Sequence, residues 1–296
     1  MAKSVHRGII LAGGSGSRLY PTSQTACKQL LPIYDKPLIY YPLATLMQFS
    51  IKEILIISTP SDIHHFEELF KDGYHLGLAI SYAVQPRPEG IAQAFLIAEE
   101  FIGDEPVALI LGDNIFYGVA ELRQEVADFK DGALIFAYYM KEPQRYGVVE
   151  FDSDGFPISI EEKPSRPRSN YAVTGFYVYD SGVVKIARNL KPSARGELEI
   201  TDVNNEYLRR GKLSAIRLGR GIAWLDAGTS ENMLAAGNFI ATIERRQGLK
   251  VACIEEIACR TGYIDNKQFR FLIDGMPDSS YRDYLAEISA EINDAG

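Results

Sequence analysis

The sequence predicts an α/β fold with an open, mostly parallel, twisted sheet flanked by helices. In the first half of the chain, short apolar runs alternate with helical patterns, as in folds whose parallel strands are joined by helices. Two of these runs, residues 54–57 and 107–111, are apolar without alternation, which is typical of strands that helices cover on both faces. This Rossmann-like arrangement places ligands beyond the carboxyl ends of the strands.

Each element follows from the spacing of its apolar residues. In the first half, strands are predicted at residues 8–11, 53–58, 78–84, 107–111 and 133–139. Helices are predicted between them at residues 38–49, 62–70, 91–101 and 120–129. The second half is more mixed, with strands predicted at residues 147–151, 158–162 and 173–179. Its helices are predicted at residues 181–190, 199–209, 231–245 and 279–292.

The chain contains no glycine- or serine-rich linker and no internal repeat. We therefore predict a single domain, residues 1–296, with a first lobe of residues 1–118 and a second lobe of residues 119–296. No apolar stretch approaches the roughly 18–20 residues that span a bilayer, and the N-terminus lacks the apolar region of a signal peptide. We expect a cytoplasmic protein that binds no membrane.

Charge and cysteine content exclude further classes of function. The formal net charge of −8 argues against a nucleic-acid partner, because proteins that bind nucleic acid are normally basic. The three cysteines form no C-x-x-C pair, so the sequence indicates neither a structural zinc site nor a disulfide framework.

A glycine-rich segment directly after the first predicted strand is the strongest functional signal. Gly13, Gly14 and Gly16 let the backbone approach a ligand closely, and successive N–H groups in such a turn form a site for anions. Arg18 and Lys28 add positive charge beside it. The segment predicts a phosphate-binding loop, with a plain glycine-rich turn between surface cations as the alternative.

Two better-known phosphate loops do not match. The third glycine of a dinucleotide fingerprint would fall on Leu19, and no acidic residue follows at the required distance. Arg18 and Leu19 also stand where a P-loop requires its Gly-Lys-Ser/Thr. These mismatches exclude a dinucleotide-dependent oxidoreductase and a P-loop enzyme.

Two carboxylates and a lysine follow later strands. Asp113 comes after the buried run 107–111, and Asp226 follows an apolar segment and precedes a turn of small residues. Carboxylate oxygens suit Mg²⁺, which takes one or two of them and fills its shell with phosphate and water. Lys163, after Glu162, could hold a second phosphate as a point charge. The alternative for Asp113 is a turn aspartate that only ends the strand, and the alternative for Asp226 is a loop or cap aspartate. The alternative for Lys163 is a solvated Glu–Lys run.

Together these residues indicate phosphoryl or nucleotidyl transfer, because such chemistry needs positioning and charge stabilisation rather than a nucleophilic side chain. The segment Gly13–Lys28 further resembles the G-G-x-G-T-R-L-x-P…K motif of the sugar-1-phosphate nucleotidylyltransferase family. Residues 28–43 resemble, more narrowly, the branch of that family that uses dTTP and glucose 1-phosphate. Further matches follow in the same order over nearly the whole chain, at residues 84–86, 90–94, 111–118, 161–164 and 224–229.

The resemblance implies a role for each matching residue. The catalytic residues would be Arg18, Lys28, Asp113, Lys163 and Asp226. The nucleotide would lie against Leu11, Gly13, Gly14, Gly16, Ser17, Arg18, Lys28, Gln29, Gln85, Gly90 and Asp113. The sugar phosphate would lie against Asn114, Tyr146, Gly147, Glu162, Lys163 and Val173. The metal ion, Mg²⁺, would be bound by Asp113 and Asp226.

The implied reaction is a single in-line displacement, in which glucose 1-phosphate attacks the α-phosphorus of dTTP to yield dTDP-glucose and pyrophosphate. In this family the reaction opens the biosynthesis of dTDP-L-rhamnose and related deoxysugars. The resemblance also implies a smaller sugar-binding lobe and C-terminal helices, with assembly and regulatory contacts after Gly248. It further implies a homotetramer and feedback inhibition by a dTDP-sugar, dTDP-L-rhamnose.

The chain departs from the family pattern at a few positions. Ser17 replaces a Thr, Cys27 replaces a Ser, and Arg87 and Glu89 replace a Ser and an Asp near the base pocket. These changes leave the charged catalytic groups in place. Two alternatives stay open at this point: the same reaction on UTP or a modified hexose phosphate, and a non-catalytic sensor of nucleotide sugars.

Overall fold

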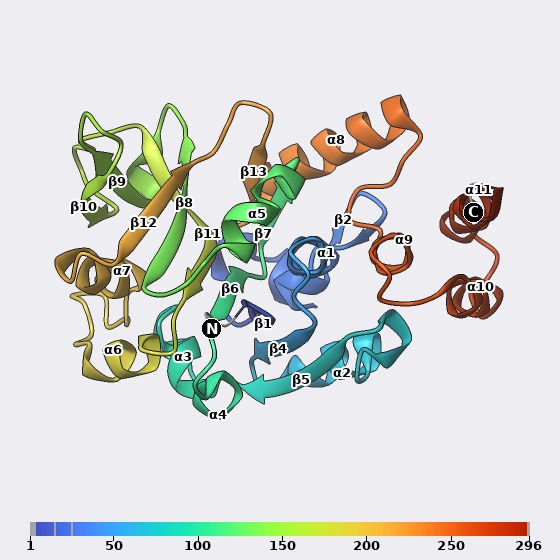
Figure 1. The fold of residues 1–296 in the computed structure, drawn as a ribbon, viewed down its shortest axis with the longest axis horizontal. Coiled ribbons are helices and arrows are strands. Elements are labelled where there is room, and N and C mark those ends of the chain that lie inside the picture. Colours follow the sequence, from blue (N-terminus) through green and yellow to red (C-terminus); the bar gives the residue numbers. More distant parts are fainter. Residues whose placement is uncertain (1–3, 15, 25, 295–296) are drawn as a thin grey trace.

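The computed structural model describes residues 4–294 except Ser15 and Thr25. Its centre is a parallel sheet of four strands in the order β5-β4-β1-β6 (Figure 1). These strands are β1 (Arg7–Leu11), β4 (Glu53–Ser58), β5 (Ala79–Val84) and β6 (Val107–Leu111). The predicted parallel core is therefore confirmed. Its strands end at one edge, where the loops after β1 and β6 emerge side by side.

Antiparallel strands extend the sheet beyond β6. The long strand β11 (Tyr171–Tyr179) pairs with β6, β8 and β9 in antiparallel fashion. The further strands are β8 (Ala133–Tyr139), β9 (Gly147–Phe151), β10 (Pro157–Glu162) and β12 (Leu213–Arg217), of which β12 pairs with β8 in parallel. They form the upper left part of Figure 1. Two small antiparallel pairs lie outside this sheet: β2 (Pro32–Ile33) with β3 (Lys36–Pro37), and β7 (Asn114–Tyr117) with β13 (Ala223–Asp226).

Successive side chains of the central strands point to opposite faces of the sheet, so two hydrophobic cores form. Ile10, Ile54 and Ile110 belong to one core, and Ile9 and Leu55 belong to the other. Helices that contribute to the first core include α1 (Tyr40–Gln48), α2 (Ile63–Phe70), α5 (Arg123–Ala127) and α8 (Ser230–Gln247). Helices of the second core are α3 (Gln93–Ile97), α4 (Glu99–Ile102), α6 (Val183–Asn189) and α7 (Ile200–Arg209).

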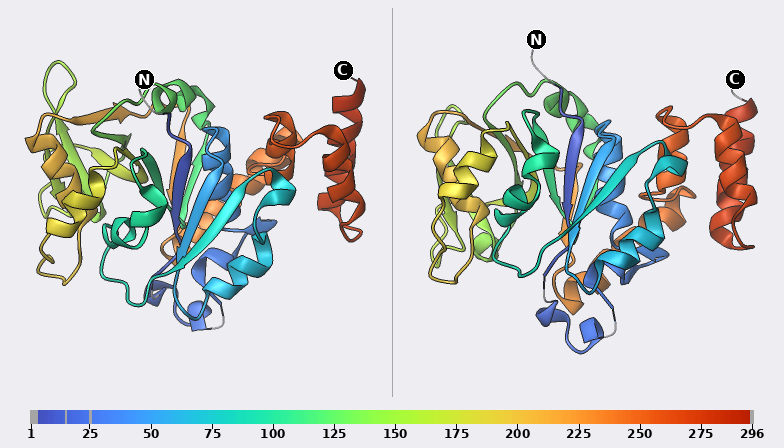
Figure 2. Two further views of the ribbon diagram at one scale, coloured as in Figure 1. Left: turned by 60° about the horizontal axis from the view of Figure 1, so that its bottom comes forward. Right: turned by 90° about the horizontal axis from the view of Figure 1, so that it is seen from below.

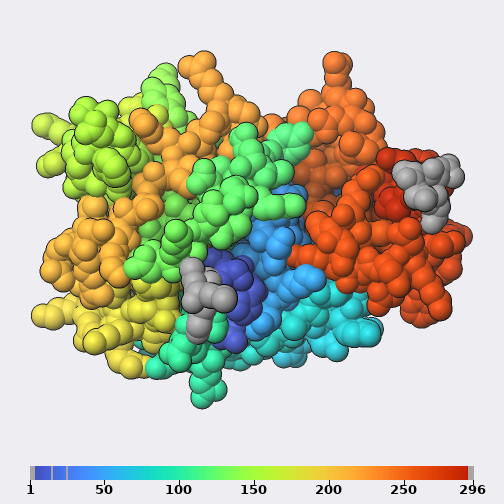
Figure 3. All heavy atoms as spheres, in the orientation of Figure 1, coloured from blue at the N-terminus to red at the C-terminus, as the bar shows by residue number. Residues whose placement is uncertain are grey.

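Three helices complete the chain: α9 (Ile254–Arg260), α10 (Asn266–Asp274) and α11 (Ser280–Asp294). Helix α9 packs on α1, and the space-filling view shows this C-terminal segment against the N-terminal half (Figure 3). Helices α10 and α11 pack on each other and stand at one edge of the molecule in both views of Figure 2. Among the described residues, no helix is long and apolar enough to cross a membrane.

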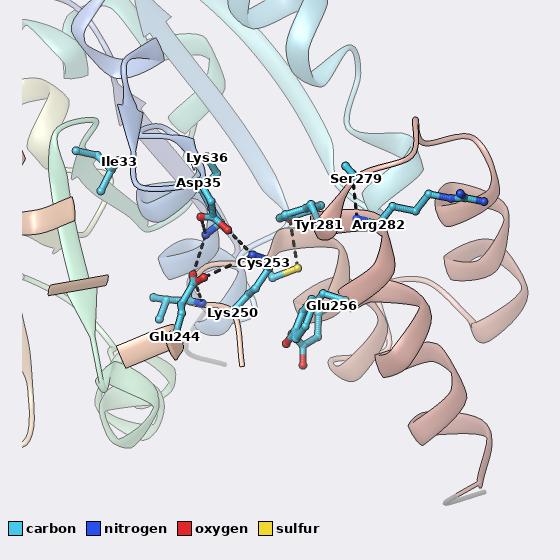
Figure 4. A network of polar contacts seen from close by, with 12 residues as sticks. Ile33, Asp35, Lys36, Glu244, Lys250, Cys253, Glu256, Ser279, Tyr281 and Arg282 are labelled. Atoms are coloured by element: carbon cyan, nitrogen blue, oxygen red, sulfur yellow. Dashed lines mark hydrogen bonds and ion pairs between the residues drawn. The ribbon is translucent and has the colours of Figure 1, made fainter. Parts of the chain in front are cut away.

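A network of charged side chains connects this C-terminal segment to the β2–β3 hairpin (Figure 4). Lys36 forms ion pairs with Asp35 and with Glu244 of α8, the latter over 3.1 Å. Lys250 pairs with the same two carboxylates and lies 5.4 Å from the ring centroid of Tyr281 in α11. The side chains of Lys36 and Glu244 are 2% and 6% exposed, so the network is a buried connection between segments far apart in sequence.

The differences from the predicted elements are local. The helix predicted at residues 91–101 is two short helices, α3 and α4, that meet at Ala98. Strands β2, β3, β7, β12 and β13 and helices α9 and α10 were not predicted. Their apolar runs are short, so no clear period distinguishes them from loops.

Candidate active site

The loop after β1 has the backbone that the glycine pattern predicts. Gly14 and Gly16 have φ angles of 116° and 57°, a region that side chains disfavour. Gly13 is required for a different reason, because a Cβ there would lie 2.2 Å from Oε1 of Gln85. Ser15, which completes this stretch of the motif, lies outside the described residues. The loop then enters a short 3₁₀ turn, Ser17–Leu19, which carries Arg18.

The loop forms one wall of a hollow at the carboxyl ends of the central strands. All the residues predicted to contact the nucleotide line this hollow: Leu11, Gly13, Gly14, Gly16, Ser17, Arg18, Lys28, Gln29, Gln85, Gly90 and Asp113. Gly90 has a φ of 107°, and a Cβ there would lie 2.4 Å from the carbonyl oxygen of Leu198. At position 90, only glycine can therefore pack this closely against the backbone of Leu198.

A second hollow adjoins the first. Both are lined by Arg18, Ile91, Leu111, Asp113 and Lys163, so the two form one continuous cleft. The second hollow contains all the residues predicted to contact the sugar phosphate: Asn114, Tyr146, Gly147, Glu162, Lys163 and Val173. Asp226 lines it as well. Residues from β7, β9, β10, β11 and β13 thus converge on one space.

The β7–β13 pair brings the two predicted metal ligands together. Asp226 stands opposite Asn114 in the antiparallel register, and the N–H of Ala227 donates to the carbonyl of Asp113 over 2.9 Å. Asn114 is 2% exposed. Its Nδ2 donates to Oδ1 of Asp113 over 2.8 Å, and its Oδ1 accepts from Nε1 of Trp224 over 2.6 Å. Asn114 therefore orients Asp113 and fixes the two strands to each other, and its contact with the sugar phosphate stays a prediction.

The two carboxylates differ in their electrostatic environment. Burial would raise the pKa of Asp113, but the ion pair and hydrogen bond from Lys28 outweigh it and lower that pKa. Burial, and then the charge of Asp113, raise the pKa of Asp226. The hydroxyl of Tyr146 donates to Oδ2 of Asp226 over 3.3 Å. Burial and the nearby Asp226 charge raise the pKa of Tyr146 to about 12, so this hydroxyl keeps its proton.

This donor set fits a magnesium ion. Two hard carboxylates lie close enough for the charge of one to raise the pKa of the other, and a divalent cation between them would relieve that repulsion. Within the described part of the chain, no group of three or more His, Cys, Asp or Glu side chains could hold a metal. Mg²⁺ usually takes only one or two carboxylates from the protein and the rest of its ligands from phosphate and water.

Arg195 is a residue of the cleft that the sequence analysis missed. It lies in the loop before α7, lines the first hollow beside Lys163, and forms ion pairs with Glu199 over 2.8 Å and with Glu162 over 3.3 Å. Its sequence neighbours form no motif, and a lone arginine before a helix is common on any surface. Only the fold places its guanidinium at the cleft.

The fold and this cleft define a class of transferase. A family profile described as Nucleotidyl transferase matches residues 7–243. A solved UDP-glucose pyrophosphorylase, complexed with UDP-glucose, superposes with a TM-score of 0.72 at 25% identity, over 82% of this chain and all of that one. The chain belongs to the nucleotidyl transferase family.

Within this class the relatives are more specific. The chain is 52% identical to a glucose-1-phosphate thymidylyltransferase from Neisseria meningitidis, over 95% of this chain and 99% of the relative. It is 54% identical to one from Mycobacterium tuberculosis, over 95% and 98%. A Bacillus anthracis structure assigned to the same enzyme superposes with a TM-score of 0.74 at 42% identity, over 79% of this chain and 94% of that one. The chain is a member of the glucose-1-phosphate thymidylyltransferases.

Proposed function

We propose that this protein transfers a thymidylyl group from dTTP to α-D-glucose 1-phosphate, and releases pyrophosphate. The observation that carries the proposal is the continuous cleft, because it brings together a glycine-rich anion loop, five cationic side chains and four carboxylates, among them Asp113 and Asp226. Each half of the cleft suits one substrate. The part of the chain up to about residue 118 would hold the nucleotide, and the remainder would hold the sugar phosphate.

On the nucleotide side, the backbone of the loop binds the triphosphate through N–H groups that converge on an anion. Arg18 lies beside the loop and would neutralise charge that develops on pyrophosphate as it leaves. Lys28, now paired with Asp113, is placed to contact phosphate at the reacting centre. Gln85 and Gly90 would contact the thymine.

On the acceptor side, Lys163 supplies positive charge for the phosphate of the sugar, and Arg195, which lines the first hollow and pairs with Glu162 of the second, adds to it. Glu162 is held by Oγ1 of Thr201 over 2.5 Å and would accept hydrogen bonds from sugar hydroxyls. A phosphate monoester is already ionised near neutral pH, so the attacking oxygen needs no general base. The protein's contribution is the in-line placement of two anions that would otherwise repel each other.

Asp113 and Asp226 would hold Mg²⁺ in the cleft. When bound, the ion supplies positive charge for the phosphate oxygens during displacement and helps to orient the triphosphate. The fixed hydrogen bond from Asn114 to Asp113 keeps one of these carboxylates in a single orientation.

Pyrophosphate release with five nucleotides tests the assignment of the substrate. With saturating glucose 1-phosphate, dTTP and UTP should be used with efficiencies within roughly a hundredfold of each other. They share the hydrogen-bonding edge and differ in the 2′-hydroxyl and in the C5 methyl, a group worth only about 1–3 kcal/mol, and neither difference leaves Gln85 unpaired. ATP, CTP and GTP should be far poorer, because their base edges would leave the buried amide of Gln85 without its partner. Equal efficiency with ATP and dTTP would contradict both the Gln85 assignment and the thymidylyl transfer.

The two cations Arg18 and Lys163 should separate kinetically. Arg18→Ala should lower kcat with dTTP by at least about tenfold, because charge develops on the leaving pyrophosphate only in the transition state. Lys163→Ala should mainly raise KM for glucose 1-phosphate, also by about tenfold, since it holds a charge that changes little before attack. Steady-state kinetics with each substrate varied in turn measure both effects. Weaker dTTP binding with an unchanged sugar-phosphate KM in Lys163→Ala would place the second phosphate elsewhere.

We infer further that the enzyme works as a cytoplasmic homotetramer in the first step of dTDP-L-rhamnose or related deoxysugar synthesis. We also infer that a dTDP-sugar, dTDP-L-rhamnose, inhibits it from a separate site. A hollow between α1, β7 and α9 supports this proposal, because it combines aromatic, cationic and acidic side chains such as Tyr117, Arg260 and Glu256. On α10, Phe271 is 79% exposed and would be a contact for assembly.

A further inference from the structure

Gln85, the residue assigned to the thymine, has its side-chain amide held by protein partners. The residue follows β5, is 3% exposed, and is fixed by its backbone N–H, which donates to the carbonyl of Ser58 over 2.7 Å. Its Nε2 donates to Oε1 of Gln93 over 2.7 Å. Its Oε1 lies beside the backbone of Gly13, 2.2 Å from the position that a Cβ on residue 13 would take.

The orientation of this amide follows from a backbone group. The N–H of Glu89 donates to Gln93 over 3.1 Å, and a backbone N–H can only donate. The atom of Gln93 at this point is therefore the oxygen. Because the same oxygen also contacts Gln85, the contacting atom of Gln85 must be its NH₂ group. The carbonyl oxygen of Gln85 must then lie on the opposite side, toward the glycine loop.

Gln93 is itself held in place. Its Nε2 donates to Oε2 of Glu89 over 2.8 Å, so both ends of its amide are bound within the turn that precedes α3. The turn is tied to the other lobe through Leu198, whose N–H donates to the carbonyl of Glu89 over 2.7 Å. The carbonyl of Leu198 accepts from the N–H of Ala92 over 3.1 Å. Gln93 is not among the described residues that line the first hollow, whereas Gln85 is.

We propose that Gln93 is a positioning residue that sets base selectivity by holding Gln85 with its carbonyl oxygen toward the base. This inference rests on the proposed thymidylyl transfer. A carbonyl oxygen in that place selects a base with an N–H at the matching position, which thymine has at N3. Cytosine carries an unprotonated nitrogen there, so two acceptors would face each other. Rotating the Gln85 amide by half a turn would reverse this preference.

Gln93→Met is the direct test, because Met has a similar length but neither donates nor accepts in the manner of an amide. Freed from its partner, Gln85 can rotate. The ratio of kcat/KM for dTTP to kcat/KM for dCTP should then fall by at least about tenfold, mainly through a higher KM for dTTP. Using dCTP keeps the sugar and the phosphates unchanged. Gln124→Met on the exposed face of α5 is the matched control and should keep the wild-type ratio.

A double variant in which residues 89 and 93 exchange their carboxylate and amide groups should restore the selectivity. Gln93→Glu alone keeps an acceptor for Gln85 but places two carboxylates against each other, so it should disturb the turn and reduce the ratio. In the double variant Gln93→Glu with Glu89→Gln, the introduced amide donates to the introduced carboxylate. That carboxylate still accepts from Gln85 and from the backbone. The double variant should recover the wild-type ratio to within about threefold.

The outcomes separate this inference from the proposed function. If the wild-type protein uses dCTP as well as dTTP, the thymidylyl assignment itself fails. If the wild type prefers dTTP and a folded Gln93→Met variant keeps the same ratio, the positioning role of Gln93 is wrong. An equal loss with both nucleotides, without recovery in the double variant, would also overturn it, because it would show only general support of the turn.

Discussion

Replacing Asp113 or Asp226 by Asn is expected to reduce turnover by at least about a hundredfold at saturating substrates, a loss of about 3 kcal/mol of transition-state stabilisation. Both changes keep the shape of the side chain and remove its charge. In the structure, the surroundings of each carboxylate favour its ionised form when a cation is bound. Lys28 already lowers the pKa of Asp113, whereas the pKa of Asp226 is raised by burial and by Asp113, a cost that a bound cation would remove.

The measurement is the initial rate of pyrophosphate release in the presence of Mg²⁺. Asp154→Asn, in the exposed loop before β10, is the matched control and should leave the rate unchanged. Circular dichroism and thermal unfolding establish that each variant is folded. A folded Asp113→Asn or Asp226→Asn protein with a near-normal rate would contradict the two-aspartate metal site.

Replacing Lys36 by Met should lower stability more than any surface substitution in this chain. Lys36 is 2% exposed and holds Asp35 and Glu244 together. Its loss leaves the buried carboxylate of Glu244 and the partly exposed carboxylate of Asp35 with Lys250 as the one remaining paired cation among the described residues (Figure 4). Breaking a buried ion pair from one side costs about 3–5 kcal/mol. The melting temperature should therefore be roughly 6–20 °C lower than in the wild type, given a shift of about 2–4 °C per kcal/mol.

The double variant Lys36→Met with Glu244→Gln should regain part of this loss, because it also removes the buried charge that has lost one of its two lysine partners. Lys185→Met on the exposed surface of α6 should change the melting temperature very little. An unchanged melting temperature in Lys36→Met would show that the network contributes nothing to stability.

The dependence of stability on pH gives the same network a second readout. Burial alone would raise the pKa of Asp35, but hydrogen bonds from Lys250 and Lys36 outweigh it and lower that pKa. A carboxylate with a lowered pKa in the folded state stabilises the protein above its unfolded pKa, and this contribution is lost as the pH falls through the folded value. The wild type should therefore lose this part of its stability in acid. The Lys36→Met variant should lose less stability in acid, because only one of the two lysines that lower the pKa of Asp35 remains.

The sequence alone predicted the parallel core and the chemistry at its edge. Strands such as β4 and β6 are buried on both faces, so their composition identifies them without knowledge of their neighbours. The glycines of the loop after β1 have a local conformational reason, since Gly14 and Gly16 adopt positive φ angles. Features whose cause lies within a few residues can be predicted from those residues.

The tertiary structure decided which distant groups meet. The pairing of β7 with β13 brings Asp226 close enough to Asp113 to raise its pKa, and nothing within either short strand predicts that pairing. Arg195 belongs to the cleft only because its loop packs near Lys163, and Gln93 matters only because Gln85 folds against it. Local periodicity contains no information about such contacts, because they arise when separate elements bury their apolar faces together and bring their polar groups within hydrogen-bond distance.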